Sequence, residues 1–318
     1  MMIEISLMIE GQNGLNWQRW RRLVAEAEQL GFAGLFRSDH FTNGQGPLLD
    51  SLETIVSLTY LADHTEHIHF GPLVAPLTFR HPTLLARQAL ALDDLSGGRM
   101  ILGVGAGWQE REHAMFGHDL GDLATRMARL EEGLEVLTRL LRSDEPTSYH
   151  GRFYRLQDAL VLPRPRRPGG PLLLIGGIGR TRTLPLVARY ADIWNALMVS
   201  PDEFRALSLH LDDLLRAQNR PPDAVRRTLM TNITFAADRP TLARKLKLPD
   251  AAADGSALDE AVASTRAARQ NIVGTPEMAR EQIAAYAEAG VQELMLQWLD
   301  LDDIAGLRAF AQTVLPSL

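Results

Sequence analysis

Short apolar runs alternate with amphipathic stretches along most of the chain. Residues 3–9 alternate and then run apolar, which is typical of a buried strand, and residues 17–30 place apolar side chains at steps of three and four, which indicates a helix. Asn16 is a residue type that caps a helix start, and Gly31 is the type that ends one. The same unit recurs, and the further predicted strands are 33–36, 68–76, 100–106, 172–175, 193–199, 228–236 and 293–298.

A helical pattern follows each predicted strand. Eight strands that alternate with eight main helices, without a linker-like change of composition, predict one (β/α)8 TIM barrel over residues 1–318. A doubly wound open sheet has the same alternation and stays as the alternative. The predicted helices are 17–30, 50–62, 82–95, 126–141, one that ends at 190, 201–217, 275–289 and 304–314.

Two stretches depart from this alternation. Residues 145–171 are rich in proline and arginine, and they predict an insertion after the fourth strand with a short hairpin around residues 149–155. Residues 238–271 are rich in alanine, aspartate and lysine, and we expect a mobile surface excursion there, after the seventh strand.

Composition narrows the classes of function. The 318 residues include no cysteine, which excludes disulfides and thiolate chemistry, and we assign no metal site. A net charge of −6 without blocks of like charge gives no footprint for nucleic acid and no polybasic membrane patch. The first ten residues carry acids inside their apolar run and do not read as a signal peptide. We expect a cytoplasmic protein whose partner is a small molecule.

In a TIM barrel, ligands bind at the carboxyl ends of the strands. Asp39 and His40 follow the second predicted strand, and an imidazole that titrates near neutral pH is the usual group for moving a proton. The competing interpretation is that the pair only caps the next turn. His64, His67 and His69 have a spacing that suggests a metal, but they lie at the amino side of the barrel, where solvated side chains are expected.

Two glycine-rich loops follow predicted strands. Residues 176–182 combine three glycines, a helix start and two arginines, which suits a phosphate or another anion, although a plain tight turn has the same composition. Gly103, Gly105 and Gly107 indicate a strand whose backbone another group approaches closely, and we expect that group to be a ligand. The spacing is not that of a dinucleotide-binding turn. Trp108 either walls a ring-shaped ligand or packs in the core.

Several runs resemble the bacterial-luciferase-like flavin and deazaflavin oxidoreductases, in the same order along the chain. The start of the chain is most similar to the branch that depends on coenzyme F-420, a deazaflavin. The runs are MIEGQNGLNW (8–17), FRSDHF (36–41), GPLVAPLTFRHP (71–82), LSGGRMILGVGAGWQEREH (95–113), GRFYRL (151–156) and LLIGGIGRTRTLPLVARYADIWN (173–195).

This resemblance implies a TIM-barrel enzyme with the cofactor ring at the carboxyl ends of the strands. His40 and Asp39 would be catalytic, with His40 as the proton donor or acceptor. A non-proline cis peptide is implied at Leu73–Val74. The residues implied to bind the cofactor are Leu73, Val74, Ala106, Gly107 and Trp108 at the ring and its side chain, and Gly176, Gly177, Gly179 and Arg182 at the phosphate. Gln109 and Pro72 depart from the family's commoner asparagine and threonine.

The cofactor decides the reaction class, because a deazaflavin transfers a hydride and does not form the oxygen adduct of a flavin. The leading hypothesis is hydride transfer between coenzyme F-420 and a small organic substrate. The alternatives are a monooxygenase that uses reduced FMN supplied by a flavin reductase, and a non-catalytic flavin-binding protein. The family is often dimeric, so a homodimer is expected.

Overall fold

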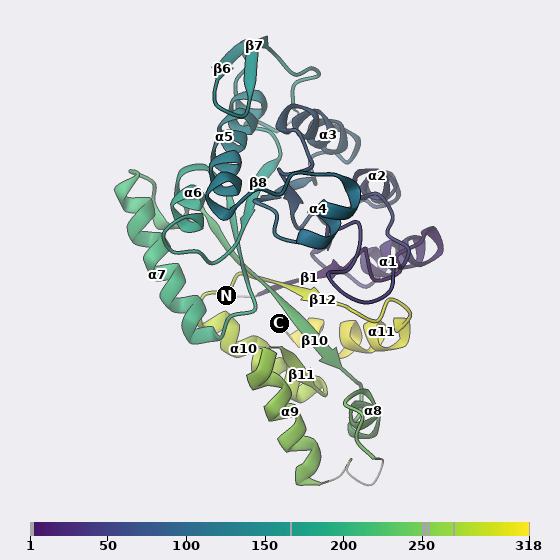
Figure 1. Cartoon of the computed structure of the whole chain (residues 1–318). Coiled ribbons are helices and arrows are strands. Elements are labelled where there is room, and N and C mark those ends of the chain that lie inside the picture. The colour runs from purple at the N-terminus through teal and green to yellow at the C-terminus, as the bar shows by residue number, and fades with distance from the viewer. Residues whose placement is uncertain (1–2, 166, 250–252, 254, 270, 318) are drawn as a thin grey trace.

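Parallel strands form a barrel in the computed structural model, which describes residues 3–165, 167–249, 253, 255–269 and 271–317 (Figure 1). In these ranges the strands pair in the order β3-β2-β1-β12-β10-β9-β8-β5-β4. The short strands β3 and β4 together form the third of the eight strand positions along the chain. The amide of Phe70 on β3 donates to the Arg99 carbonyl before β5 at 3.3 Å, which closes the ring. The strands are β1 (Glu4–Ile9), β2 (Gly34–Arg37), β3 (His69–Pro72), β4 (Ala75–Pro76), β5 (Ile101–Gly105), β8 (Leu172–Gly176), β9 (Ile193–Leu197), β10 (Arg226–Phe235) and β12 (Glu293–Gln297).

Helices follow these strands as the periodicity predicts, so the TIM-barrel fold class is confirmed and the open-sheet alternative is wrong. Asn16 Oδ1 accepts from the Arg19 amide at 3.1 Å and caps the first helix. The second helix begins at Thr54 rather than at residue 50, because Glu53 provides its cap. The main helices are α1 (Trp17–Gln29), α2 (Thr54–His64), α3 (Pro82–Leu95), α5 (Leu123–Arg142), α6 (Thr183–Tyr190), α7 (Pro201–Ala217), α10 (Pro276–Glu288) and α11 (Ile304–Thr313).

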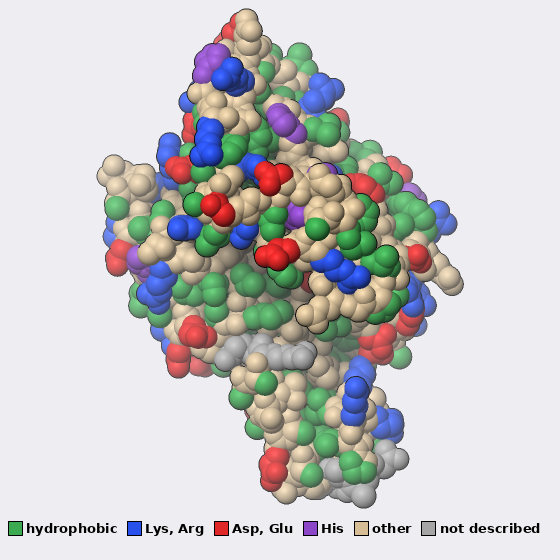
Figure 2. All heavy atoms as spheres, in the orientation of Figure 1, with side chains coloured by type: hydrophobic (Ala, Val, Ile, Leu, Met, Phe, Trp, Pro, Cys, Tyr) green, Lys and Arg blue, Asp and Glu red, His purple; other side chains and the backbone are tan. Residues whose placement is uncertain are grey.

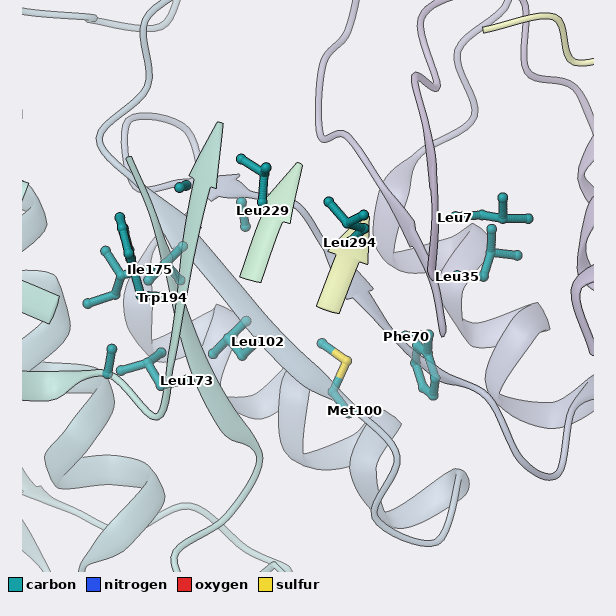
Figure 3. Packing of buried hydrophobic residues seen from close by; sticks show 14 of the residues in the cluster. Leu7, Leu35, Phe70, Met100, Leu102, Leu173, Ile175, Trp194, Leu229 and Leu294 are labelled. Atoms are coloured by element: carbon teal, nitrogen blue, oxygen red, sulfur yellow. The ribbon is translucent and has the colours of Figure 1, made fainter. Parts of the chain in front are cut away.

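Two apolar layers hold the barrel. The larger one lies between the strands and the surrounding helices, and it includes Leu7, Leu35 and Phe70 from the first three strand positions (Figure 3). The smaller one fills the barrel interior with residues such as Phe36 and Met295. Successive residues of a strand point to opposite sides, so one strand contributes to both layers. None of the helices in the described ranges is long and apolar enough to cross a membrane.

The first insertion contains the predicted hairpin. Strands β6 (Thr147–His150) and β7 (Arg155–Ala159) pair antiparallel, and the Gly151 amide donates to the Tyr154 carbonyl at 2.9 Å across the turn. The hairpin projects beside α5 in Figure 1.

The second insertion differs from our expectation of a mobile excursion, although part of it lies outside the described residues. It forms helices α8 (Arg239–Lys245) and α9 (Ser256–Arg269), followed by β11 (Ile272–Gly274), which pairs with the end of β10. Leu242, Leu258 and Val273 belong to a separate small core in this region. Alanine favours helices, and the leucines give these two helices a surface to bury. Figure 2 shows this part as a lobe that projects from the main body.

Gly103 and Gly105 on β5 are approached closely by the chain itself. A Cβ atom at Gly103 would overlap the Pro72 carbonyl oxygen, and one at Gly105 would lie 2.6 Å from Val74 Cγ2. Our expectation that a ligand makes this approach is therefore wrong for these two glycines. They allow the third strand position, where the Leu73–Val74 peptide is cis as the resemblance implies, to pack against β5.

We expect Gly103→Ala to lower the free energy of unfolding by about 2 kcal/mol or more, because the new methyl group meets backbone that has to move. Chemical denaturation of the purified protein measures this. Gly255→Ala is the matched control, since a Cβ there has its nearest neighbour at 4.0 Å. Equal stability of the two variants would contradict the packing described above.

Candidate functional site

A cavity of about 400 Å³ opens at the carboxyl ends of the barrel strands. Residues from all eight strand positions, or from the loops that follow them, line it, from Met8 on β1 to Gln297 on β12. The structure brings most of the predicted site residues together here: His40, Leu73, Val74, Ala106, Gly107, Trp108, Gly176 and Gly177 all line the cavity. Asp39, Gly179 and Arg182 do not line it.

His40 is held by a buried carboxylate. Its Nδ1 lies 2.8 Å from Glu112 Oε1, and the other oxygen of Glu112 accepts from the Phe41 amide at 2.9 Å. Glu112 comes from the short helix α4 (Glu110–Phe116), where acids in the first turn favour the helix N-terminus. Because Nδ1 faces the carboxylate, Nε2 is the atom free to exchange a proton, and no described residue hydrogen-bonds it.

The pKa of His40 lies above its ordinary value. Burial lowers this pKa, while the hydrogen bond and the negative charge of Glu112 raise it and outweigh burial. The carboxylates of Glu10 and Asp39 raise it further. Protonated His40 is therefore populated to a higher pH than a free imidazole, so near neutral pH the ring is able both to donate and to accept a proton.

Trp108 lies beside the cavity rather than in the core. Its side chain is 66% exposed, and its ring packs edge-on against His40 with the ring centroids 5.5 Å apart. The core interpretation of this residue is therefore wrong. An exposed indole next to a titratable ring offers a flat apolar surface to a planar ligand.

The cavity lining also includes glycines and small side chains. Val74 lies in the chain between β3 and β4. A Cβ on Gly176 would be 3.4 Å from Val74 Cγ1. Ala106, Gly107 and Gly177 continue this surface, and Gly107 has a left-handed φ of 75°. Glycine lets a ligand approach the backbone closely, and the cavity volume lies within the range of small-molecule sites. These residues fit a planar cofactor ring.

Asp39 lies directly before His40 but faces away from the cavity. It is buried, and both of its oxygens accept from Arg80, one at 2.8 Å and the other closer still. Arg80 also donates to Glu53 at 2.6 Å, which links this loop to the start of α2. Asp39 thus fixes the backbone that carries His40.

The predicted anion-binding loop leads from the cavity to α6. Gly177 has a φ of 133°, and the Thr183 amide donates to the Gly179 carbonyl at 2.9 Å. The side chain of Arg182 is at the helix N-cap and makes no capping hydrogen bond. The Leu184 amide donates to the same carbonyl at 2.9 Å and Pro185 has no N–H, so the group in this loop that favours an anion is the exposed guanidinium of Arg182.

A polar network on the β1 side was missed by our sequence reasoning. Gln12 Nε2 donates to Glu10 Oε2 at 2.7 Å, Gln297 Nε2 donates to Glu10 Oε1, and Ser38 Oγ donates to Gln12 Oε1 at 2.7 Å. Glu10 directly follows the first strand, so the rule that selected His40 also applies to it. Glu112 had no comparable local signal, because it meets His40 from 72 positions away.

A proton-transfer residue at the carboxyl end of a parallel barrel is typical of TIM-barrel enzymes. The family model described as luciferase-like monooxygenase matches residues 2–293. This chain belongs to the luciferase-like monooxygenase family, as its motifs predict, and it is an enzyme of that family.

Named relatives agree in fold and differ in cofactor. An F-420-dependent glucose-6-phosphate dehydrogenase of Amycolatopsis mediterranei is 26% identical over 317 residues, which cover 93% of this chain and 92% of the relative. An FMNH2-dependent dimethylsulfone monooxygenase of Pseudomonas putida is 24% identical over 322 residues, covering 93% and 86%. A solved F-420-dependent secondary alcohol dehydrogenase, in complex with an F-420–acetone adduct, has a TM-score of 0.82 at 17% identity and covers 99% of this chain and 98% of that chain.

We expect Glu112→Gln to lower the pKa of His40, because the charge that offsets burial is lost. An NMR titration of the imidazole signals measures this shift. Glu110→Gln, an exposed position on the same helix, is the control and leaves the His40 titration unchanged. A His40 pKa that does not fall in Glu112→Gln would show that this contact does not control the imidazole.

Proposed function

We propose that this chain is an oxidoreductase that transfers a hydride between coenzyme F-420 and a small organic substrate. The observation that carries the proposal is the position of His40: Glu112 holds its Nδ1, and its Nε2 is left for chemistry beside a cavity with a flat glycine-rich side. The F-420-dependent relative, which this chain covers over almost its whole length, supports the choice of cofactor.

We propose that the ring and the phosphate of the cofactor bind at two different parts of the site. Leu73, Val74, Ala106, Gly107 and Trp108 would contact the ring and its side chain. The phosphate would lie at the loop that leads to α6, near Gly176, Gly177, Gly179 and Arg182. Support comes from the exposed guanidinium of Arg182 in this loop, since a guanidinium favours an anion.

When bound, the deazaflavin supplies or accepts the hydride. The substrate oxygen gains or loses a proton in the same reaction, and His40 Nε2 is the group we assign to that proton. Glu112 keeps the imidazole in one orientation and raises its pKa, so the ring serves in either direction. Asp39 acts through its ion pair with Arg80, as a residue that positions His40.

A monooxygenase that uses reduced FMN from a flavin reductase is the second candidate, and the dimethylsulfone monooxygenase relative favours it. Oxygen consumption separates the two. The F-420 enzyme reduces or oxidises its cofactor without consuming oxygen, whereas the monooxygenase consumes oxygen only with reduced FMN. A non-catalytic flavin-binding protein would do neither.

We expect His40→Ala to lower cofactor-dependent turnover by about 10²–10⁴-fold while the cofactor still binds, because the variant removes the proton carrier and leaves the ring surface intact. Turnover is followed by the absorbance of F-420, and binding by its fluorescence. His67→Ala is the control, since this exposed histidine precedes the third strand position at the amino side of the barrel. Unchanged turnover in His40→Ala would refute the catalytic assignment.

A further inference from the structure

Carboxylates outnumber cationic groups in the described lining of the cavity. Glu10 and Glu112 line it together with His40, and no described lysine or arginine is among its lining residues. Two arginines of the neighbouring loops are not available to the cavity, because Arg37 is fully buried and Arg80 is held by Asp39 and Glu53. The site therefore repels an anion more than it attracts one.

This charge pattern bears on the substrate. A phosphate group carries close to two negative charges at neutral pH, and proteins bind it with arginine, lysine or free backbone amides. In a partly enclosed site, two carboxylates with only His40 to balance them disfavour such a group by Coulomb repulsion. A phosphorylated sugar, the substrate named for the relative from Amycolatopsis mediterranei, does not fit this site.

Much of the remaining lining is apolar and adaptable, with Ser38, Asn195 and Gln297 as its polar members. Met8, Leu197, Met198 and Met230 contribute to it. Methionine side chains are flexible and polarisable, so they pack against apolar bodies of different shape. The part of the substrate next to the ring is therefore expected to be apolar.

A second cavity of about 340 Å³ lies farther along β10, between that strand and α9. Along β10, the side chains of Met230, Asn232 and Thr234 point to the same side because they lie two residues apart, and each step advances about 7 Å. Met230 lines the first cavity, and the other two line the second. Asn232 Nδ2 lies 3.9 Å from Met198 Sδ, so a residue that lines the second cavity contacts one that lines the first.

Neutral hydrogen-bonding groups line this second cavity. Asn232 Nδ2 donates to Asn271 Oδ1 at 3.2 Å, and Ser264 and Thr265 face the same space from α9. No described charged side chain is among its lining residues. Amides and hydroxyls of this kind recognise hydroxyl, ether or carbonyl oxygens.

We propose that the substrate is an uncharged molecule that spans both cavities, with an apolar part and the reacting alcohol or carbonyl beside His40 and with oxygen groups at its far end beside Asn232. This inference rests on the proposed function. The α9 helix thereby becomes part of the substrate site, and Asn232 becomes a residue that determines specificity.

Three probes test this on the protein loaded with its cofactor: octan-2-ol, octane-1,7-diol and the 1-phosphate ester of that diol. Equilibrium binding is read from the fluorescence of bound F-420, or of FMN if that cofactor binds instead. We expect the diol to bind at least about tenfold more tightly than its phosphate ester, because only the ester brings negative charge to cavities that hold two carboxylates and no described lysine or arginine. Equal or tighter binding of the ester overturns the proposal, and so does absence of binding by both alcohols up to their solubility.

Asn232→Ala tests the second cavity. We expect it to raise the Kd of the diol about five- to tenfold, through loss of a hydrogen bond in a buried setting, and to leave the Kd of octan-2-ol unchanged. Thr234→Ala is the second variant, should Asn232→Ala fail to fold, and Gln218→Ala is the remote control at an exposed position. An equal change for both alcohols overturns the role of Asn232.

The cofactor titration that precedes these measurements separates the two levels of failure. A protein that binds neither F-420 nor FMN refutes the proposed function. A protein that binds its cofactor and prefers the phosphate ester refutes only the inference about the substrate.

Discussion

The close packing of the third strand position against β5 is the contact on which the site depends. Gly103 and Gly105 have no side chains, and this space is taken by the Pro72 carbonyl and by Val74. Leu73 and Val74 consequently line the cavity, and Gly176 on the next strand leaves room for Val74 as well. A larger residue on β5 would push this segment outward and change the flat side of the cavity.

A second constraint joins two loops that follow different strands. Glu112 accepts from the Phe41 amide and contacts His40, so the loop after β5 holds the loop after β2. Asp39 and Arg80 hold the same loop from its other side. His40 is thus fixed by charged contacts on both sides, while Trp108 packs against its ring. Preorganisation of this kind keeps a proton-transfer group oriented without cost at the moment of reaction.

Local pattern was sufficient for the barrel and for much of the cavity, and insufficient for contacts between distant residues. The spacing of apolar residues, every second position in strands and every three to four positions in helices, placed the strands and main helices. The rule that ligands bind at the carboxyl ends of barrel strands selected His40 and the glycine loops. Neither signal reveals that Glu112 meets His40 or that Val74 fills the space at Gly105, because those partners are set by the closed ring of strands. The α8–α9 lobe was missed because its small core is visible only once the leucines are brought together.

The central claim is that this cavity takes a deazaflavin ring beside His40. The most direct measurement is a pair of fluorescence-quenching titrations of the purified protein with coenzyme F-420 and with FMN under identical conditions. The account predicts saturable binding of F-420 with a Kd at least about tenfold below that of FMN, a difference of roughly 1.4 kcal/mol. Tighter binding of FMN, or no saturable binding of F-420, would contradict it.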